Sequence, residues 1–90
     1  MLNAMAMCLA MNMYHEARSE GVAAMMAVAE VTMNRVHSKH YPNNVCDVVK
    51  QNKYGETLNT CQFSWYCDGK SDRMKDKVWF NISYELAVDY

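Results

Sequence analysis

Apolar residues recur at helical spacing from the start of the chain. Leu2, Met5, Leu9 and Met13 lie three or four positions apart, which predicts a helix that runs to about residue 16. The opening run has no positively charged start and contains two asparagines, so it is not typical of a signal peptide. It is also shorter than the ~20 residues that cross a bilayer. We therefore interpret it as a core helix.

A second helix is predicted by the clearest apolar stripe in the sequence. Residues 18–21 interrupt the first periodicity, and Ser19 is a suitable N-cap for the helix that follows. The stripe consists of Val22, Met25, Met26, Ala29, Met33 and Val36. We expect this helix to end near Ser38, because the turn sequence around Pro42 comes next.

The rest of the chain contains two further helices and one irregular region. Asn44 can cap a short helix over residues 45–51. Residues 52–72 are polar and rich in turn formers, which favours a small hairpin. A last amphipathic helix is predicted over residues 75–90, with Val78, Ile82, Leu86 and Tyr90 on one face. The expected fold is mainly α (α+β), with about four helices and a short β-hairpin or irregular insertion near 52–72.

The composition fits one small domain over residues 1–90. A chain of 90 residues buries only about 60% of its unfolded surface, so the core is thin. Nine methionines against two phenylalanines suggest an adaptable core. The net charge of −1, with scattered lysines and arginines, argues against a nucleic-acid binder. An anionic polymer would have to be recognised by shape and hydrogen bonds.

Four cysteines in so short a chain suggest disulfide bonds, and three full pairings are available. Cys8 lies in the middle of the first helix and is expected to be a buried thiol. Cys46, Cys61 and Cys67 flank the loop-rich middle of the chain, where a bridge would restrain a long connection. A zinc site that combines two of these cysteines with His37 and His40 fits no standard ligand spacing, so we expect no metal.

One carboxylate continues the apolar face of the first helix. The position that follows Met13 on that face is Glu16. Burial disfavours the charged form and the partial negative charge of a helix end repels it, so both effects should raise the pKa of Glu16. A glutamic acid that keeps its proton is what protonation of a glycosidic oxygen requires. The alternatives are that Glu16 turns into water at the frayed helix end, or pairs with Arg18 or Arg35.

Residues 62–65 combine aromatic rings with hydrogen-bonding groups. Gln62, Phe63, Ser64 and Trp65 suit a sugar, which has apolar ring faces and a polar rim. An equally good explanation is that the two rings cover the thin core. Of the other carboxylates, Glu20 is explained by its place in a first helical turn. Glu30 lies off the apolar stripe and could face either solvent or the same cleft as Glu16.

Four segments together resemble the SleB-like cell-wall hydrolases, the spore-cortex-lytic group with many bacterial and phage members. They are residues 14–21 (YHEARSEG), 27–36 (AVAEVTMNRV), 41–49 (YPNNVCDVV) and 61–69 (CQFSWYCDG). Each motif alone is weak, but their order and their spread over nearly the whole chain make the resemblance strong.

The resemblance implies a compact lysozyme-like domain, related to the goose-type lysozymes and lytic transglycosylases. Glu16 matches the catalytic acid. The expected substrate-binding residues are Tyr14, Glu30, Asn34, Gln62, Phe63, Ser64 and Trp65. In a lytic transglycosylase, one glutamate protonates the oxygen between N-acetylmuramic acid and N-acetylglucosamine and then accepts the proton of the C6 hydroxyl, which closes a 1,6-anhydro ring. Such a reaction needs no metal or other cofactor.

The resemblance leaves alternatives of chemistry and context open. An N-acetylmuramoyl-L-alanine amidase, or a non-catalytic peptidoglycan-binding module, would share the same substrate. Members of the group usually continue past the position of Tyr90, so we expect a fragment, a minimal version, or a cleft that lacks one wall. Without a signal peptide, we expect synthesis in the cytoplasm and action on the cell wall. A phage-encoded protein that reaches the wall through a holin or virion machinery, without stable membrane insertion, fits this pattern.

Overall fold

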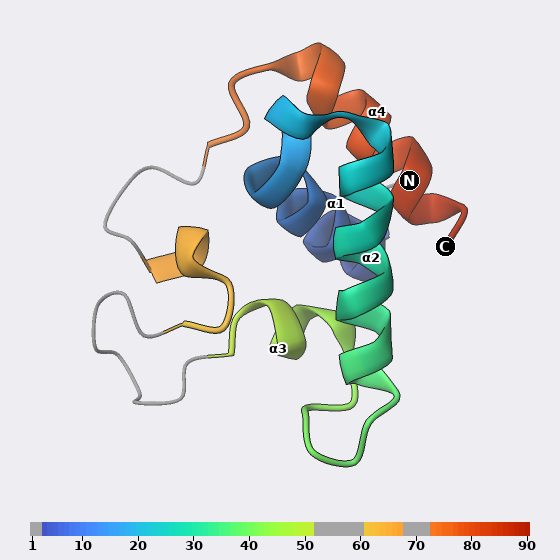
Figure 1. Cartoon of the computed structure of the whole chain (residues 1–90), viewed down its shortest axis with the longest axis vertical. Helices are drawn as coiled ribbons and strands as arrows, with labels where there is room; N and C mark the ends of the chain where they lie inside the picture. Colours follow the sequence, from blue (N-terminus) through green and yellow to red (C-terminus); the bar gives the residue numbers. More distant parts are fainter. Residues whose placement is uncertain (1–2, 52–60, 68–72) are drawn as a thin grey trace.

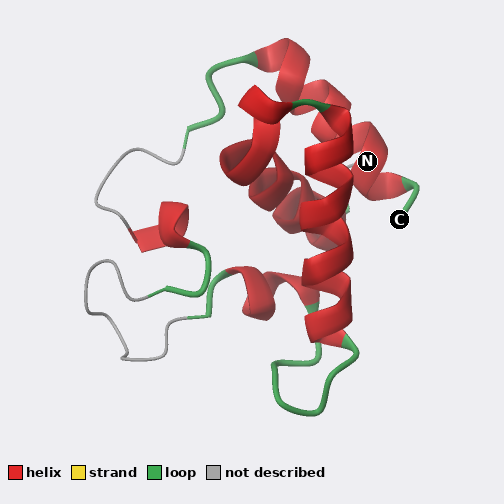
Figure 2. Cartoon of the chain, in the orientation of Figure 1, coloured by secondary structure: helices red, strands yellow, loops and turns green. Residues whose placement is uncertain are grey.

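The computed structural model describes residues 3–51, 61–67 and 73–90, although not the side chains of Ser64 and Cys67. Within these ranges the chain is mainly helical, as predicted (Figures 1 and 2). The α-helices are α1 (Ala4–Ala17), α2 (Val22–Val36), α3 (Val45–Val49) and α4 (Lys77–Val88), and the 3-10 helices are η1 (Arg18–Glu20) and η2 (Ser64–Cys67). The predicted hairpin near 52–72 lies mostly outside the described residues. Its described part, 61–67, contains η2 and no strand.

Side-chain caps begin three of the helices. Asn3 accepts hydrogen bonds from the first backbone amides of α1, Asn44 caps α3 as predicted, and Asp76 caps α4. The predicted Ser19 cap of α2 is wrong, because Ser19 lies inside η1 and Gly21 is the N-cap. Gly21 has a φ of 94°, a value that favours glycine, and this turn redirects the chain from η1 into α2.

Helix α1 lies at the centre of the molecule and packs against α2, α3 and α4 (Figure 1). It is therefore buried around much of its circumference rather than along one stripe. Its buried residues are Ala6, Leu9, Ala10, Asn12, Met13, Tyr14 and Ala17. The predicted stripe is correct for Leu9 and Met13 and wrong for Met5, which is 53% exposed. Many of these residues are small, which allows close packing of three neighbouring helices.

Helix α2 turns most of the predicted stripe to the core, because Met33 and Val36 pack against it as well as the buried Met25 and Ala29. Met25, Ala29 and Thr32 are its buried residues, whereas Val22 and Met26 of the predicted stripe are exposed. The buried face thus also contains Thr32, a polar residue outside the predicted stripe. Thr32 can be buried because its hydroxyl donates to the Val28 carbonyl oxygen at 2.8 Å.

A disulfide joins α1 to the start of α3. Cys8 and Cys46 are bonded, with their Cα atoms 5.2 Å apart, and 38 positions separate them in the sequence. The expectation that Cys8 is a buried thiol is therefore wrong. The sulfur of Cys46 is not available as a thiolate ligand, and Cys61 is disulfide-bonded as well. None of the helices in the described part of the chain is long and apolar enough to cross a membrane.

Candidate functional site

Glu16 lies in the last turn of α1, as the sequence predicts. Its side chain is exposed, because Tyr14 and Ala17, rather than Glu16, continue the buried face beyond Met13. The expectation of a buried position is thus wrong, yet the predicted direction of its pKa is confirmed. Desolvation by the surrounding protein raises the pKa of Glu16, and the positive charge of Arg35 opposes this increase. The raised pKa favours the protonated form relative to a freely solvated glutamate, and the exposed side chain remains in reach of a ligand.

Arg35, in the last turn of α2, is held between two aromatic rings. Its guanidinium carbon lies 4.9 Å from the centre of the Phe63 ring and 5.3 Å from that of Tyr41. These contacts are cation–π interactions, which favour a partly desolvated cation. They attach the segment before η2 to the end of α2. Arg35 therefore acts on Glu16 through its charge and also contacts Phe63, one of the predicted sugar-binding residues.

A buried polar network positions Trp65. The indole nitrogen of Trp65 donates to the Asn12 side-chain oxygen at 2.8 Å, and the Asn12 amide donates to the Thr32 hydroxyl at 2.9 Å. Asn12 and Thr32 are fully buried, so these bonds replace hydration that both groups have lost. The Trp65 ring also stacks on His15, with centroids 4.5 Å apart. Trp65 therefore lies against the turn of α1 that carries Glu16.

The structure separates the predicted binding residues into buried and exposed groups. Tyr14 is buried, and its hydroxyl accepts a hydrogen bond from the Asp76 backbone amide at 2.9 Å, so it holds the start of α4. Phe63 and Trp65 are only 7% and 8% exposed and contribute chiefly to the core. The side chain of Ser64 is outside the described part. The exposed members are Glu30, Asn34 and Gln62.

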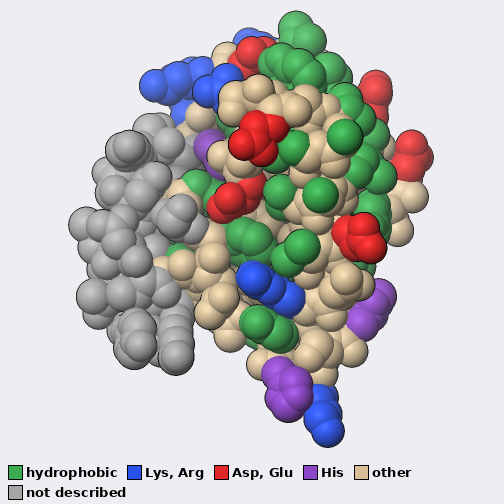
Figure 3. Space-filling view, viewed as in Figure 1, with side chains coloured by type: hydrophobic (Ala, Val, Ile, Leu, Met, Phe, Trp, Pro, Cys, Tyr) green, Lys and Arg blue, Asp and Glu red, His purple; other side chains and the backbone are tan. Residues whose placement is uncertain are grey.

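The contacts connect some of these residues with Glu16 and leave others apart. Phe63 is connected through Arg35, and Trp65 through His15. Glu30 and Asn34 are exposed on α2, and no described contact links them to Glu16. On the described part of the face in Figure 3, acidic and basic side chains are scattered among hydrophobic ones, which agrees with the sequence charge pattern.

Sequence reasoning missed the residues that support this site. Asn12 was visible only as a polar interruption of an apolar run, and Thr32 gave no signal. His15 and Arg35 belong to the quoted motifs but were not assigned to the site. Tyr66 is 38% exposed and meets Trp65 edge-on at 5.8 Å, so it offers an accessible ring where Trp65 does not. An asparagine within an apolar helix face could have indicated a buried partner.

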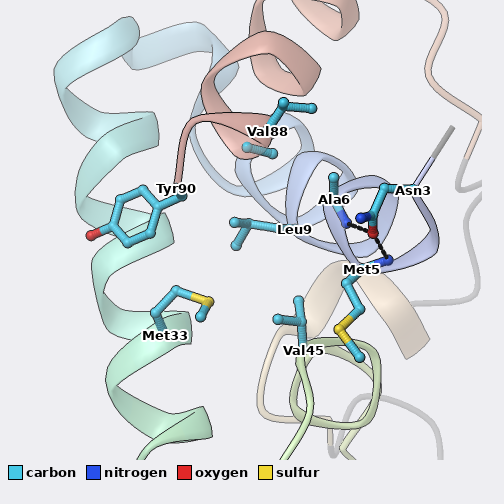
Figure 4. A pocket seen from close by; sticks show the side chains of 9 residues that line it. Asn3, Met5, Ala6, Leu9, Met33, Val45, Val88 and Tyr90 are labelled. Carbon is cyan, nitrogen blue, oxygen red and sulfur yellow. Dashed lines mark hydrogen bonds between the residues drawn. The ribbon is translucent and has the colours of Figure 1, made fainter. Parts of the chain in front are cut away.

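A pocket lies near the other end of α1 and contains none of these residues (Figure 4). Its volume is about 260 Å³. It is lined by Asn3, Met5, Ala6, Leu9, Met33, Val45, Ala87, Val88 and Tyr90. This lining is mostly apolar and has no acid–base group, so it does not suit a sugar substrate. We therefore place the candidate site at Glu16 on chemical grounds. Among the described residues, no group of three His, Cys, Asp or Glu side chains could hold a metal ion.

Comparison with known families identifies the chain at a general level. Residues 19–89 match the family of cell wall hydrolases. The chain belongs to the cell wall hydrolase family. This cell wall hydrolase therefore has a domain that degrades peptidoglycan, the polymer on which such a family acts. The match includes Arg35 and residues 61–67 but begins after Glu16. No curated protein and no solved structure matches the chain.

Proposed function

We propose that this cell wall hydrolase is a SleB-like lytic transglycosylase, with Glu16 as its single acid–base residue. The bond to be cleaved is the glycosidic bond between N-acetylmuramic acid and N-acetylglucosamine. The observation that carries the proposal is the combination at Glu16 of solvent exposure with a raised pKa. A proton donor benefits from both, because it must reach the substrate and must favour its protonated form more than a freely solvated glutamate does.

The two opposing influences on Glu16 suit the two halves of such a reaction. In the first half, partial desolvation favours the neutral acid, which donates its proton to the bridging oxygen as the glycosidic bond breaks. In the second half, the carboxylate removes the proton of the C6 hydroxyl while that oxygen forms the 1,6-anhydro ring. The nearby charge of Arg35 stabilises the carboxylate between these steps. One carboxylate is sufficient, because the sugar supplies its own nucleophile.

The exposed residues beside Trp65 are the substrate contacts in this proposal. Gln62 supplies an amide and Tyr66 an accessible ring, and the two can meet the polar rim and apolar face of a sugar. Phe63 and Trp65 act behind them as supports. In the same proposal, the protein is phage-encoded and made in the cytoplasm. It reaches the wall through a holin or virion machinery.

Analysis of the digestion products tests the chemistry. Purified peptidoglycan is incubated with the wild type and the soluble products are identified by mass spectrometry. We expect muropeptides that end in 1,6-anhydro-N-acetylmuramic acid. Free stem peptides would instead indicate an amidase, reducing sugar ends a hydrolysing muramidase, and binding without soluble products a non-catalytic module. Each of these three outcomes contradicts the proposal.

Substitution of the proposed acid tests the residue. Glu16→Gln keeps the size of the side chain but has no proton to donate, so we expect product release to fall at least about 10²-fold. The matched control is Glu20→Gln, which alters an exposed carboxylate in η1 and should leave the rate within twofold. Undiminished lysis by Glu16→Gln would remove this residue from the role.

A further inference from the structure

Arg35 has donor groups that the described residues do not satisfy. A guanidinium carries five N–H donors, and those of Arg35 form no hydrogen bond with the described residues. One nitrogen, Nη1, is enclosed without any partner, whereas the side chain as a whole is only half-buried. An enclosed donor without an acceptor is unfavourable and uncommon in folded proteins. Because the side chain is only half-buried, part of Arg35 remains open to solvent.

The guanidinium is also fixed in place before any ligand arrives. The rings of Tyr41 and Phe63 hold it from two different segments of the chain, at 5.3 and 4.9 Å. A cation restrained in this way loses little further freedom when it binds an anion, and a guanidinium is well suited to carboxylates. Phe63 is two residues from Trp65, whose ring stacks on His15, the neighbour of Glu16 in α1. These contacts place the guanidinium on the side of the molecule that carries the proposed acid, where its charge acts on Glu16.

An ion pair within the chain is the obvious use of such an arginine, but Arg35 forms none within residues 3–51, 61–67 and 73–90. Arg35 and Glu16 influence each other through space without forming a salt bridge among the described residues. By contrast, Arg18 lies over the Tyr14 ring at 5.0 Å on the exposed surface and has no enclosed, unsatisfied nitrogen. Arg35 therefore combines a restrained cation, an unmet donor and proximity to Glu16.

We propose that Arg35 binds a carboxylate of the peptidoglycan strand beside Glu16 and so makes the site selective for strands that carry this charge. The substrate class rests on the proposed function. Peptidoglycan offers carboxylates from two sources, the stem peptides and the lactyl group of a muramic acid whose peptide has been removed. A neutral polymer of N-acetylglucosamine offers none. Arg35 is thus a specificity-determining residue, and Glu16 carries out the chemistry.

Binding measured without turnover tests this inference. All variants carry Glu16→Gln, and three ligands are compared: intact peptidoglycan, strands stripped of stem peptides, and a neutral N-acetylglucosamine oligomer. We expect Arg35→Met to weaken binding of a carboxylate-bearing ligand about 10- to 100-fold and to leave the weak binding of the neutral oligomer within twofold. A loss on stripped strands alone identifies the lactyl group, because its carboxyl forms the amide bond to the stem peptide wherever a peptide is present. A loss on both charged ligands shows that either carboxylate can bind. A loss on intact strands alone identifies the stem peptide.

The matched control is Arg18→Met, which removes the same charge and a similar ring contact, and it should leave binding of all three ligands within twofold. Equal losses on charged and neutral ligands, or no loss at all, would overturn the inference. Thermal unfolding shows whether Arg35→Met still folds. If it does not, Arg35→Lys keeps the charge without the guanidinium and should bind charged ligands less tightly while folding normally. Because no step needs catalysis, failure of the lyase chemistry would leave these results interpretable.

Discussion

At the scale of single residues, Glu16 shows how a surface carboxylate can still favour its protonated form. The side chain is exposed, so substrate and water can reach it, yet the surrounding protein removes enough hydration to raise its pKa. Arg35 limits that increase. Such a balance has a consequence for stability as well as for catalysis, because a pKa that differs between folded and unfolded states makes folding depend on pH.

The sign of that dependence can be predicted. A raised pKa means that the folded state holds the Glu16 proton more tightly than the unfolded state does. Glu16 therefore stabilises the fold most when pH is below its unfolded pKa, and this contribution is lost as pH increases through the folded pKa. Glu16→Gln cannot ionise, so relative to the wild type it should gain stability between pH 4 and pH 7. Thermal unfolding of both proteins at these two pH values measures the difference, which we expect to be small because the group is exposed.

The opposite sign would also be informative. If Glu16→Gln lost stability relative to the wild type as pH increased, the carboxylate would be stabilised in its charged form, with Arg35 as the source. Glu20→Gln serves as the reference, because it removes an exposed carboxylate from η1 and leaves Glu16 in place.

At the scale of helices, the buried hydrogen bonds among Asn12, Thr32 and Trp65 connect α1, α2 and η2. Apolar contacts alone would let these elements shift relative to one another, whereas two directed bonds near 2.9 Å fix one arrangement. The stack of Trp65 on His15 continues this connection to the end of α1. The network thus sets where η2, with its exposed Tyr66, lies relative to Glu16.

A double-mutant cycle measures how much the bond between Asn12 and Trp65 contributes. Asn12→Leu leaves the indole N–H buried without an acceptor and should cost about 1–3 kcal/mol of unfolding free energy. Trp65→Phe keeps a ring but removes the donor. The double variant should lose less than the sum of the two, with a coupling of about 1 kcal/mol in urea unfolding. Exposed Gln62→Ala is the control and should change stability by less than about 0.5 kcal/mol. Strict additivity would show that the bond contributes nothing.

The same elements show what sequence can and cannot predict here. The existence and order of the helices follow from apolar spacing and from caps such as Asn44, which are local signals. The buried faces were harder to predict, because α1 has neighbours on three sides and α2 buries Thr32 against Asn12. Glu16 could be found from its motif, but its exposure and the contacts of Arg35 depend on segments far away in the sequence. Such contacts leave no periodic pattern.

At the scale of the whole molecule, a small core is supplemented by covalent bonds. A domain of this size has a free energy of unfolding of only about 5–15 kcal/mol, so a single crosslink changes a large part of it. The Cys8–Cys46 bond joins the central helix to α3, whose residues Val48 and Val49 are almost fully buried. Helix α3 has only five residues and would have little stability by itself. The bond keeps its apolar face on the core.

Removal of this disulfide should therefore destabilise the whole domain. The 38-position separation predicts a loss of about 2–4 kcal/mol, which for a domain of this size lowers the melting temperature by on the order of 10–30 °C. The double substitution of Cys8 and Cys46 to serine, compared with the wild type by calorimetry, tests this while leaving Cys61 oxidised. A dithiol reductant should lower the melting temperature of the wild type below that of the variant, because it also reduces the Cys61 bond. A variant that melts at the wild-type temperature would show that α3 holds its place through packing alone. The crosslink would then contribute nothing to the surface that presents Glu16.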